Sequence, residues 1–205
     1  MNNERFPGKN IRILGGKPLI YYIQEALLRA DNLDSISVFC SNEAIKRYLL
    51  KGVEYIKRPE KLDLPESNFT QIFQCFMENN EADAYVYAHA TAPFITTEII
   101  NDCTGAVLSG RYDSAFCATK IQDFLWKNGS PLNFDAQNIP RSQDLEPIYR
   151  ETSGIYVYTK EVFQNLRRRI GDAPYIKELS LREAIDINEY KDFKFAEIML
   201  GQYDL

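Results

Sequence analysis

The stretch "ADAYVYAHA" at residues 82–90 is a mostly apolar run that contains the only histidine of the chain, His89. A continuous run of this kind is typical of a strand that is buried on both faces, as in the parallel sheet of an α/β protein. The segments on either side of it alternate between strand-like and helix-like patterns. The stretch therefore predicts a strand in a sheet that helices cover on both faces.

Working outward from this strand gives the other elements. Further strands are predicted over 34–40, 53–59, 112–121 and 153–159. Helices are predicted over 17–30, 42–50, 68–80, 96–110, 160–169 and 180–184. The three arginines at 167–169 would fan around their helix, which favours a solvated surface. The alternation of strand and helix indicates a three-layer α/β fold.

The composition is that of an ordinary globular protein. The 205 residues are 45% hydrophobic and 26% charged, which suits one domain over 1–205. A net charge of −5 argues against a nucleic-acid partner. We expect neither a membrane span nor a signal peptide. The four scattered cysteines favour buried free thiols, and we expect a cytoplasmic protein.

One segment breaks the alternation. Residues 123–152 mix aromatic, proline and polar residues without a clear period, and include Trp126. A long irregular segment inside a compact domain is often functional. We expect an irregular arm that lies over a substrate site or makes a dimer contact.

The N-terminal stretch "RFPGKN" at residues 5–10 has the features of a phosphate loop. Gly8 allows the backbone to approach an anion, and Arg5 and Lys9 flank the turn with positive charge. Pro-Gly-Lys is also found in ordinary type I and type II turns that carry a solvated lysine.

Six stretches in chain order resemble the CMP-sialic acid synthetase family, the cytidylyltransferases that activate sugar acids. They cover nearly the whole chain, although each is a weak motif alone. They are "RFPGKNIRILGGKPLIYYIQEAL", "SVFCSNEAI", "IKRPEKL", "AHATAPF", "RSQDLEPIYRETSGIYVY" and "EAIDINEYKDFKFAE".

The resemblance implies a Rossmann-like, three-layer nucleotidyltransferase with a mostly parallel sheet. It implies that a sugar acid attacks CTP to give a CMP-sugar and pyrophosphate, with Mg²⁺ as cofactor and a homodimer as the assembly. Arg5, Lys9 and Asp186 would be catalytic. The nucleotide would meet Arg5, Gly8, Lys9, Asn10, Arg58, Asn68 and Thr70. The sugar would meet His89, Thr91, Arg141, Gln143 and Arg150, and the metal would meet Asp186 and Asn188.

Simpler roles compete with several of these assignments. Arg58 could form a surface ion pair with Glu60, and His89 could bond a backbone carbonyl at the core edge. Many family members carry glutamine at the position of His89, and two aspartates where this chain has Asp186 and Asn188. Those two residues could also brace a loop, whereas Asp192 is expected to start a helix.

The family's first strand would end at the position of Met1, so we expect an N-terminal strand to be missing. A start assigned too late, a truncation and a rearranged sheet would each produce this pattern. Two other functions therefore stay open: a catalytically impaired nucleotide- or sugar-binding homologue, and a nucleotidyltransferase that uses a different NTP. The sequence leaves the identity of the sugar acid open.

Overall fold

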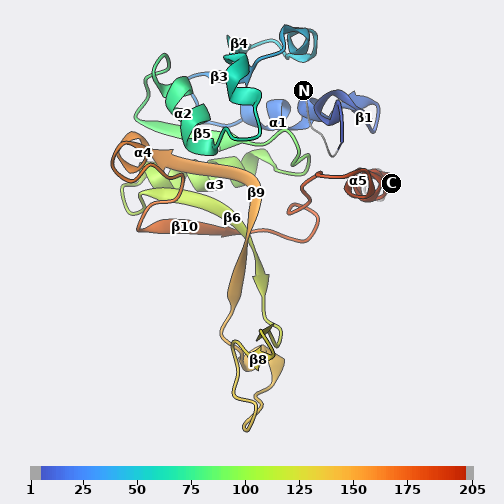
Figure 1. The fold of residues 1–205 in the computed structure, drawn as a ribbon, viewed down its shortest axis with the longest axis vertical. Coiled ribbons are helices and arrows are strands. Elements are labelled where there is room, and N and C mark those ends of the chain that lie inside the picture. The colour runs from blue at the N-terminus through green and yellow to red at the C-terminus, as the bar shows by residue number, and fades with distance from the viewer. Residues whose placement is uncertain (1–5, 202–205) are drawn as a thin grey trace.

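A four-stranded sheet forms the middle layer of the computed structural model, which describes residues 6–201 (Figure 1). Strand β9 runs antiparallel to both β6 and β5, whereas β10 runs parallel to β6. The sheet is therefore mixed, with β9 as the reversed strand. Its order is β10 (Pro174–Glu178), β6 (Ser114–Ile121), β9 (Ile148–Thr159) and β5 (Ala84–Ala88).

Helices cover both faces of this sheet, as predicted. Successive residues of a strand point to opposite faces, and β9 shows this directly. Ile155 and Val157 pack with α1 (Leu19–Leu28) and α3 (Thr97–Leu108). Tyr156 and Tyr158 pack with α2 (Phe69–Met77) and α4 (Lys160–Leu166). The three-layer α/β fold is confirmed.

Strands β3 (Ile36–Cys40) and β4 (Val53–Lys57) form a separate parallel pair. Among residues 6–201, no strand pairing joins β3 to β5. In the described part of the chain, β3 and β5 therefore each keep one edge without a strand partner.

The predicted arm is present, but it is more regular than expected. Strands β6 and β9 continue beyond the sheet as a two-stranded ribbon, in which Ala118–Ile121 face Ile148–Glu151 (Figure 1). The distal end holds a small hairpin of β7 (Trp126–Lys127) and β8 (Ser130–Pro131), and a 3-10 turn η4 (Ser142–Asp144). Strand β9 begins at Ile148 rather than at the predicted residue 153, because the polar residues at its start do not show a strand pattern.

The remaining elements frame the N-terminal side. A short hairpin of β1 (Ile13–Leu14) and β2 (Lys17–Pro18) precedes α1, and α5 (Tyr190–Gly201) packs near it around a second small core. The 3-10 helices η2 (Glu43–Tyr48) and η3 (Glu60–Asp63) follow β3 and β4. Within the described residues, no helix combines the length and apolar character of a membrane span.

Candidate active site

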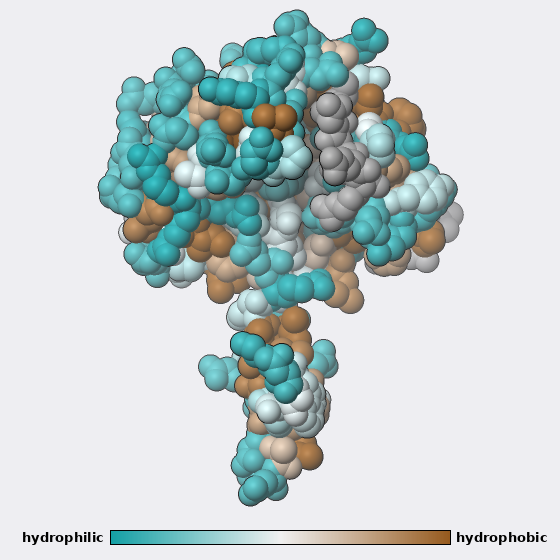
Figure 2. All heavy atoms as spheres, in the orientation of Figure 1, coloured by the Kyte–Doolittle hydropathy of each residue, from teal (hydrophilic) through white to brown (hydrophobic). Residues whose placement is uncertain are grey.

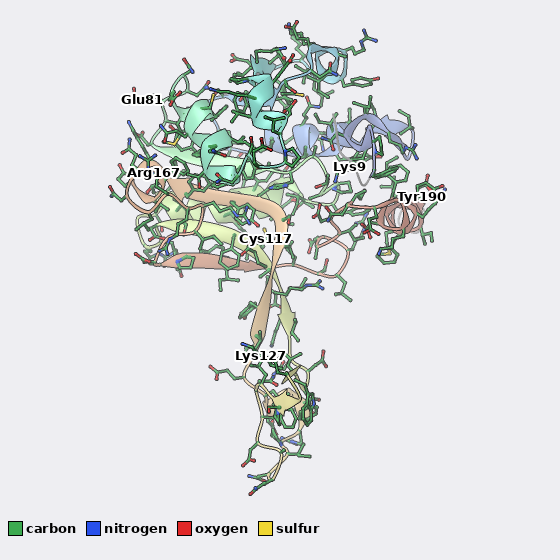
Figure 3. The ribbon with its side chains drawn as sticks, viewed as in Figure 1. Lys9, Glu81, Cys117, Lys127, Arg167 and Tyr190 are labelled. Carbon is green, nitrogen blue, oxygen red and sulfur yellow. The ribbon has the colours of Figure 1, made fainter. Side chains whose placement is uncertain are left out.

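The Pro-Gly turn at residues 7–8 folds as a tight loop that opens the 3-10 helix η1 (Lys9–Ile11). Gly8 has a φ of 69°, in the left-handed region that glycine adopts without steric cost. The Lys9 side chain points inward: the residue is only 7% exposed, and Nζ donates a 2.8 Å hydrogen bond to the carbonyl oxygen of Ile187 (Figure 3). Lys9 is therefore not the solvated lysine of an ordinary surface turn.

Two other polar residues of this loop, Asn10 and Arg5, were predicted to meet the nucleotide. The Oδ1 atom of Asn10 is buried and has no hydrogen-bond partner in the part of the chain described. A buried polar atom of this kind is costly unless something binds it. Arg5 lies outside the described residues, so its role stays a prediction.

Asp186 and Asn188 lie side by side on the loop that Lys9 contacts. The amide Nδ2 of Asn188 donates to Asp186 Oδ2 at 2.8 Å, whereas Asp186 Oδ1 is buried without a partner within residues 6–201. The backbone N–H of Ile187 donates to the Thr91 carbonyl oxygen at 2.8 Å. Asp192 accepts the N–H groups of residues 188 and 189 just before α5, which confirms its expected role at a helix start.

His89 follows β5 directly and faces the same region. Its ring lies 4.7 Å from that of Tyr87 and 6.2 Å from that of Tyr156, centroid to centroid. Its Nε2 is buried and has no partner among the described residues. Burial lowers the pKa of His89 to about 4; the Asp186 carboxylate opposes this shift, and Arg169 and Lys9 add to it. The imidazole is therefore neutral near pH 7.

This shift predicts a pH-dependent stability. The unfolded chain binds the His89 proton below about pH 6.5, but the folded chain does so only near pH 4. The free energy of unfolding should therefore be unaffected by this group above pH 6.5 and should fall by up to roughly 3 kcal/mol as the pH drops to 4.

His89→Gln is the matched variant, because glutamine keeps a polar side chain that does not titrate. Urea denaturation of both proteins, at about pH 7 and about pH 4.5, measures the difference. We expect the variant to lose roughly 2 kcal/mol less stability than the wild type over this interval. Equal losses would contradict the buried, neutral histidine.

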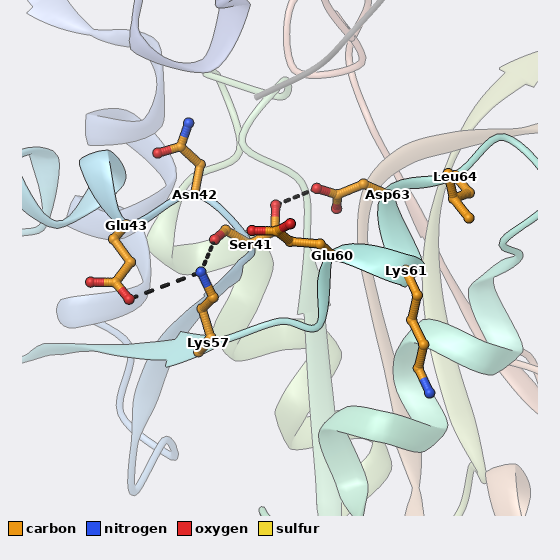
Figure 4. A pocket seen from close by; sticks show the side chains of 8 residues that line it. All are labelled: Ser41, Asn42, Glu43, Lys57, Glu60, Lys61, Asp63 and Leu64. Carbon is orange, nitrogen blue, oxygen red and sulfur yellow. Dashed lines mark hydrogen bonds and ion pairs between the residues drawn. The ribbon is translucent and has the colours of Figure 1, made fainter.

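A separate cavity of about 730 Å³ opens beyond the carboxyl ends of β3 and β4 (Figure 4). Ligands bind at such strand ends in open α/β sheets. Lys57 Nζ donates to the Ser41 carbonyl oxygen at 2.6 Å and lies 3.9 Å from a Glu43 carboxylate oxygen. The lining residues are Ser41, Asn42, Glu43, Lys57, Glu60, Lys61, Asp63 and Leu64.

Arg58 lies beside this cavity, bound to Asp63 rather than to Glu60. Its Nε and Nη2 reach one Asp63 oxygen at 3.1 and 2.5 Å, and the Ser41 hydroxyl donates to the other oxygen. Burial acts to raise the pKa of Asp63, but the hydrogen bonds from Ser41 and Arg58 outweigh it and lower the pKa. Arg58 therefore forms an ion pair, as the simpler prediction had it, but with Asp63 in place of Glu60.

Asn68 and Thr70 both make hydrogen bonds within the protein at the start of α2. The Asn68 side chain accepts from the N–H of Gln71, whose own side chain accepts from the N–H of Asn68, so the two form a capping box. The Thr70 hydroxyl donates to the Arg167 carbonyl oxygen at 3.2 Å. Their predicted contact with the nucleotide base stays a prediction.

The predicted sugar-binding residues do not all meet within one chain. His89 and Thr91 lie in the body, but Arg141 and Gln143 lie in the arm, which the β6–β9 ribbon carries away from the body (Figure 1). Arg141 pairs there with Asp144 at 2.7 Å. Arg150 lies on the ribbon, where its Nε donates to the Thr119 hydroxyl at 3.2 Å.

The structure adds three residues that the sequence analysis did not assign: Glu151, Tyr156 and Arg169. Of the three arginines expected on a solvated surface, Arg167 and Arg168 are exposed as predicted, whereas Arg169 is half-buried. Its Cζ lies 4.0 Å from the Tyr156 ring centroid, and its Nη2 lies 2.9 Å from Glu151 Oε1. The same Glu151 oxygen accepts the Tyr156 hydroxyl at 2.5 Å. Burial, and then this hydrogen bond, raise the pKa of Tyr156.

A family model described as cytidylyltransferase matches residues 1–199 of the chain. An N-acylneuraminate cytidylyltransferase from Oncorhynchus mykiss is 26% identical over an alignment of 205 positions, which covers 95% of this chain and 47% of that protein. A pseudaminic acid cytidylyltransferase from Campylobacter jejuni is 25% identical over an alignment of 211 positions, which covers 96% of this chain and 91% of that protein. The chain thus spans about half the length of the N-acylneuraminate relative.

Solved structures share the fold. A CMP:2-keto-3-deoxy-manno-octonic acid synthetase complexed with CTP superposes with a TM-score of 0.73 at 16% identity, covering 99% of this chain and 95% of the other. A 4-diphosphocytidyl-2C-methyl-D-erythritol synthase from Anaerococcus prevotii gives 0.69 at 14% identity, covering 96% and 94%. At these identities the likeness concerns the α/β fold alone.

Proposed function

The chain belongs to the cytidylyltransferase family, and on this premise we propose that it activates a sugar acid with CTP, giving a CMP-sugar and pyrophosphate. The names of two relatives, which specify N-acylneuraminate and pseudaminic acid, support the substrate class. All four cysteines are free thiols, which supports a cytoplasmic location.

The reaction joins the anomeric oxygen of the sugar acid to the α-phosphorus of CTP. The hydroxyl loses its proton, the bond from this phosphorus to the bridging oxygen breaks, and pyrophosphate leaves with the electron pair. Transfer of this kind depends mainly on positioning and on charge stabilisation. The fold offers a buried cation at Lys9 and a backbone turn at Gly8 for the phosphates.

One observation carries the proposal. Three loops that are far apart in the sequence meet through Lys9, Thr91 and Ile187, and they bring Asp186 to the neighbourhood of His89. At this meeting point Asp186 Oδ1 and His89 Nε2 are both buried without a partner in the described part of the chain. Buried polar atoms in this state are expected where a ligand supplies the missing bonds.

Mg²⁺ is the cofactor that we propose. Its preferred ligands are oxygens, and it usually takes one or two carboxylates together with substrate phosphates. Asp186 Oδ1 fits as a protein ligand, and Asn188 orients the carboxylate or adds its own carbonyl oxygen. Residues 6–201 contain no group of three or more potential ligands among His, Cys, Asp and Glu, so the phosphates would supply the other oxygens. The metal would neutralise charge that develops on the phosphates.

Asn188→Asp should strengthen metal binding. A second carboxylate beside Asp186 raises the negative charge of the site, and the affinity for hard cations rises with ligand charge. We expect the Mg²⁺ concentration for half-maximal pyrophosphate release to fall several-fold. Titrating Mg²⁺ against wild type and variant measures this, and identical midpoints would place the metal elsewhere.

A homodimer is the assembly that we propose, with the arm as its contact. The arm exposes large apolar side chains, among them Trp126 at 60%, Leu132 at 52% and Ile139 at 65% (Figure 2). Isolated two-stranded hairpins are barely stable in water, so a hairpin with this much apolar surface suits a partner. In such a dimer Arg141 and Gln143 would reach the partner's sugar site.

The double variant Trp126→Ser with Ile139→Ser should therefore dissociate the dimer. Removing two exposed apolar side chains from the arm reduces the buried interface without touching the body of the fold. Light scattering at micromolar concentration should show a dimer for the wild type and a monomer for the variant. Leu181→Ser, which removes an 81% exposed leucine from the body, is the control and should stay dimeric. A monomeric, fully active wild type would contradict the proposal.

The reaction itself is tested by following pyrophosphate release from CTP, Mg²⁺ and a panel of sugar acids that includes an N-acylneuraminate and pseudaminate. Release that needs both CTP and one of these acids supports the proposal. Release with UTP or another NTP in place of CTP would favour a different nucleotidyltransferase. Ligand binding without release would favour an impaired homologue, the alternative that Asn188 raises.

A further inference from the structure

Arg169 lies against Tyr156, whose ring is near that of His89. Helix α4 ends at Leu166, because the next residue, Arg167, has a left-handed φ of 55° and caps the helix ahead of Arg169. The guanidinium then covers the Tyr156 ring at 4.0 Å and lies 5.5 Å from the Phe69 centroid. Contact with aromatic rings holds a guanidinium in place at low conformational cost.

The guanidinium charge of Arg169 lies near His89, at the candidate site. Arg169 lies over the Tyr156 ring, which is 6.2 Å from the His89 ring, so its charge is close to the unpartnered His89 Nε2. It adds to the lowering of the His89 pKa and opposes the rise that burial causes in the pKa of Tyr87. Arg58 also acts on Tyr87, but two of its nitrogens are bound to Asp63. Within residues 6–201, Arg169 makes a single hydrogen bond, from Nη2 to Glu151. A guanidinium carries five N–H donors, so most of them remain for a ligand.

We propose that Arg169 is a specificity-determining residue that binds the carboxylate of the sugar acid beside His89. The choice of ligand rests on the proposed function. Arginine is the natural bidentate partner of a carboxylate, and its stacking on Tyr156 fixes the plane in which that carboxylate lies. Two other arginines were predicted to meet the sugar. Arg141 lies in the arm, bound to Asp144 in its own chain, and Arg150 lies on the ribbon, where it donates to Thr119.

The test compares an anionic ligand with an uncharged one of nearly the same shape. Calorimetric titration of the full chain, with and without CMP, uses N-acetylneuraminate and its methyl ester as probes. We expect the wild type to prefer the acid by roughly 10-fold or more, the size of a charge-assisted hydrogen bond. Arg169→Gln should weaken acid binding by about the same factor and leave ester binding within about 2-fold.

Arg168→Gln is the matched control. It removes the same charge one residue earlier, from a side chain that pairs with Asp172 on the surface, and it should bind both probes like the wild type. Glu151→Gln keeps the oxygen that accepts the Tyr156 hydroxyl but removes the competing charge. It should keep or increase the preference for the acid.

Three outcomes would overturn the proposal. The first is a wild type that binds neither probe or does not distinguish them. The second is an Arg169→Gln protein that keeps the preference or loses both probes equally, because a structural role gives equal loss. The third is a Glu151→Gln protein that loses acid binding in parallel with Arg169→Gln. Pyrophosphate release by the wild type is measured separately, so failed catalysis with intact discrimination would reject only the proposed function.

Discussion

Replacing Asp186 by alanine should abolish most pyrophosphate release. The side chain has one oxygen held by Asn188 and one buried oxygen without a partner in the described chain, and Lys9 binds the backbone next to it. Removing the carboxylate takes away the proposed metal ligand, and with it the Mg²⁺ charge that would offset the charge of the triphosphate. Metal stabilisation of a phosphoryl oxygen is worth several kcal/mol, so we expect a loss of roughly 100-fold or more in turnover.

Asp186→Asn is the control for this prediction. It keeps the size of the side chain and an oxygen that can accept from Asn188, but it lacks the negative charge. A role in metal binding predicts that both variants lose activity and that both need more Mg²⁺. A role as a loop brace predicts that Asp186→Asn stays active, and this result would move the metal site elsewhere. Circular dichroism of each protein shows whether the fold is kept.

Lys9→Met should weaken the handling of CTP. Methionine keeps the buried stem of the side chain but removes the ammonium group that donates to Ile187. A charge-assisted hydrogen bond to phosphate is worth about 1.5–3 kcal/mol, so the KM for CTP should rise roughly 10- to 150-fold. Steady-state kinetics with varied CTP measures this effect.

Lys17→Met serves as the matched control, because Lys17 is an exposed lysine whose ammonium group lies 4.0 Å from the Tyr21 ring. Its removal should leave the KM for CTP unchanged. A Lys9→Met protein with unchanged KM and turnover would mean that the lysine only ties η1 to the loop at Ile187. The Pro-Gly turn would then have no part in phosphate binding.

The fold was predictable where hydrophobic patterns decide it. The run over 84–88 is apolar because Tyr85 and Tyr87 face one layer and Val86 and Ala88 face the other. The prediction failed where a local signal lacked tertiary support. In residues 180–184, the side chains of Ser180 and Glu183 each accept a hydrogen bond from the backbone N–H of the other residue, as at the start of a helix. The segment nevertheless forms only a turn. The bond from Ile187 to Thr91 lies just beyond this turn and holds the chain in an extended loop.

The site was predictable only in part. The adjacency of Asp186 and Asn188 follows from an extended segment, and their hydrogen bond confirms it. The position of Arg169 depends on a left-handed residue at Arg167, for which a non-glycine residue gives no reliable signal. The separation of Arg141 from His89 depends on the length of the β6–β9 ribbon. That length could not be predicted, because the polar residues of the ribbon do not show a strand pattern.

The most direct test of the central claim is to identify the product. Mass spectrometry of a reaction containing CTP, Mg²⁺ and an N-acylneuraminate or pseudaminate should reveal the CMP-linked sugar acid together with one pyrophosphate per product, and neither should form without the acid. The account predicts this product for the wild type and its near absence for Asp186→Ala. Release of pyrophosphate with no CMP-sugar, or no turnover with any sugar acid by a folded, CTP-binding protein, would contradict it.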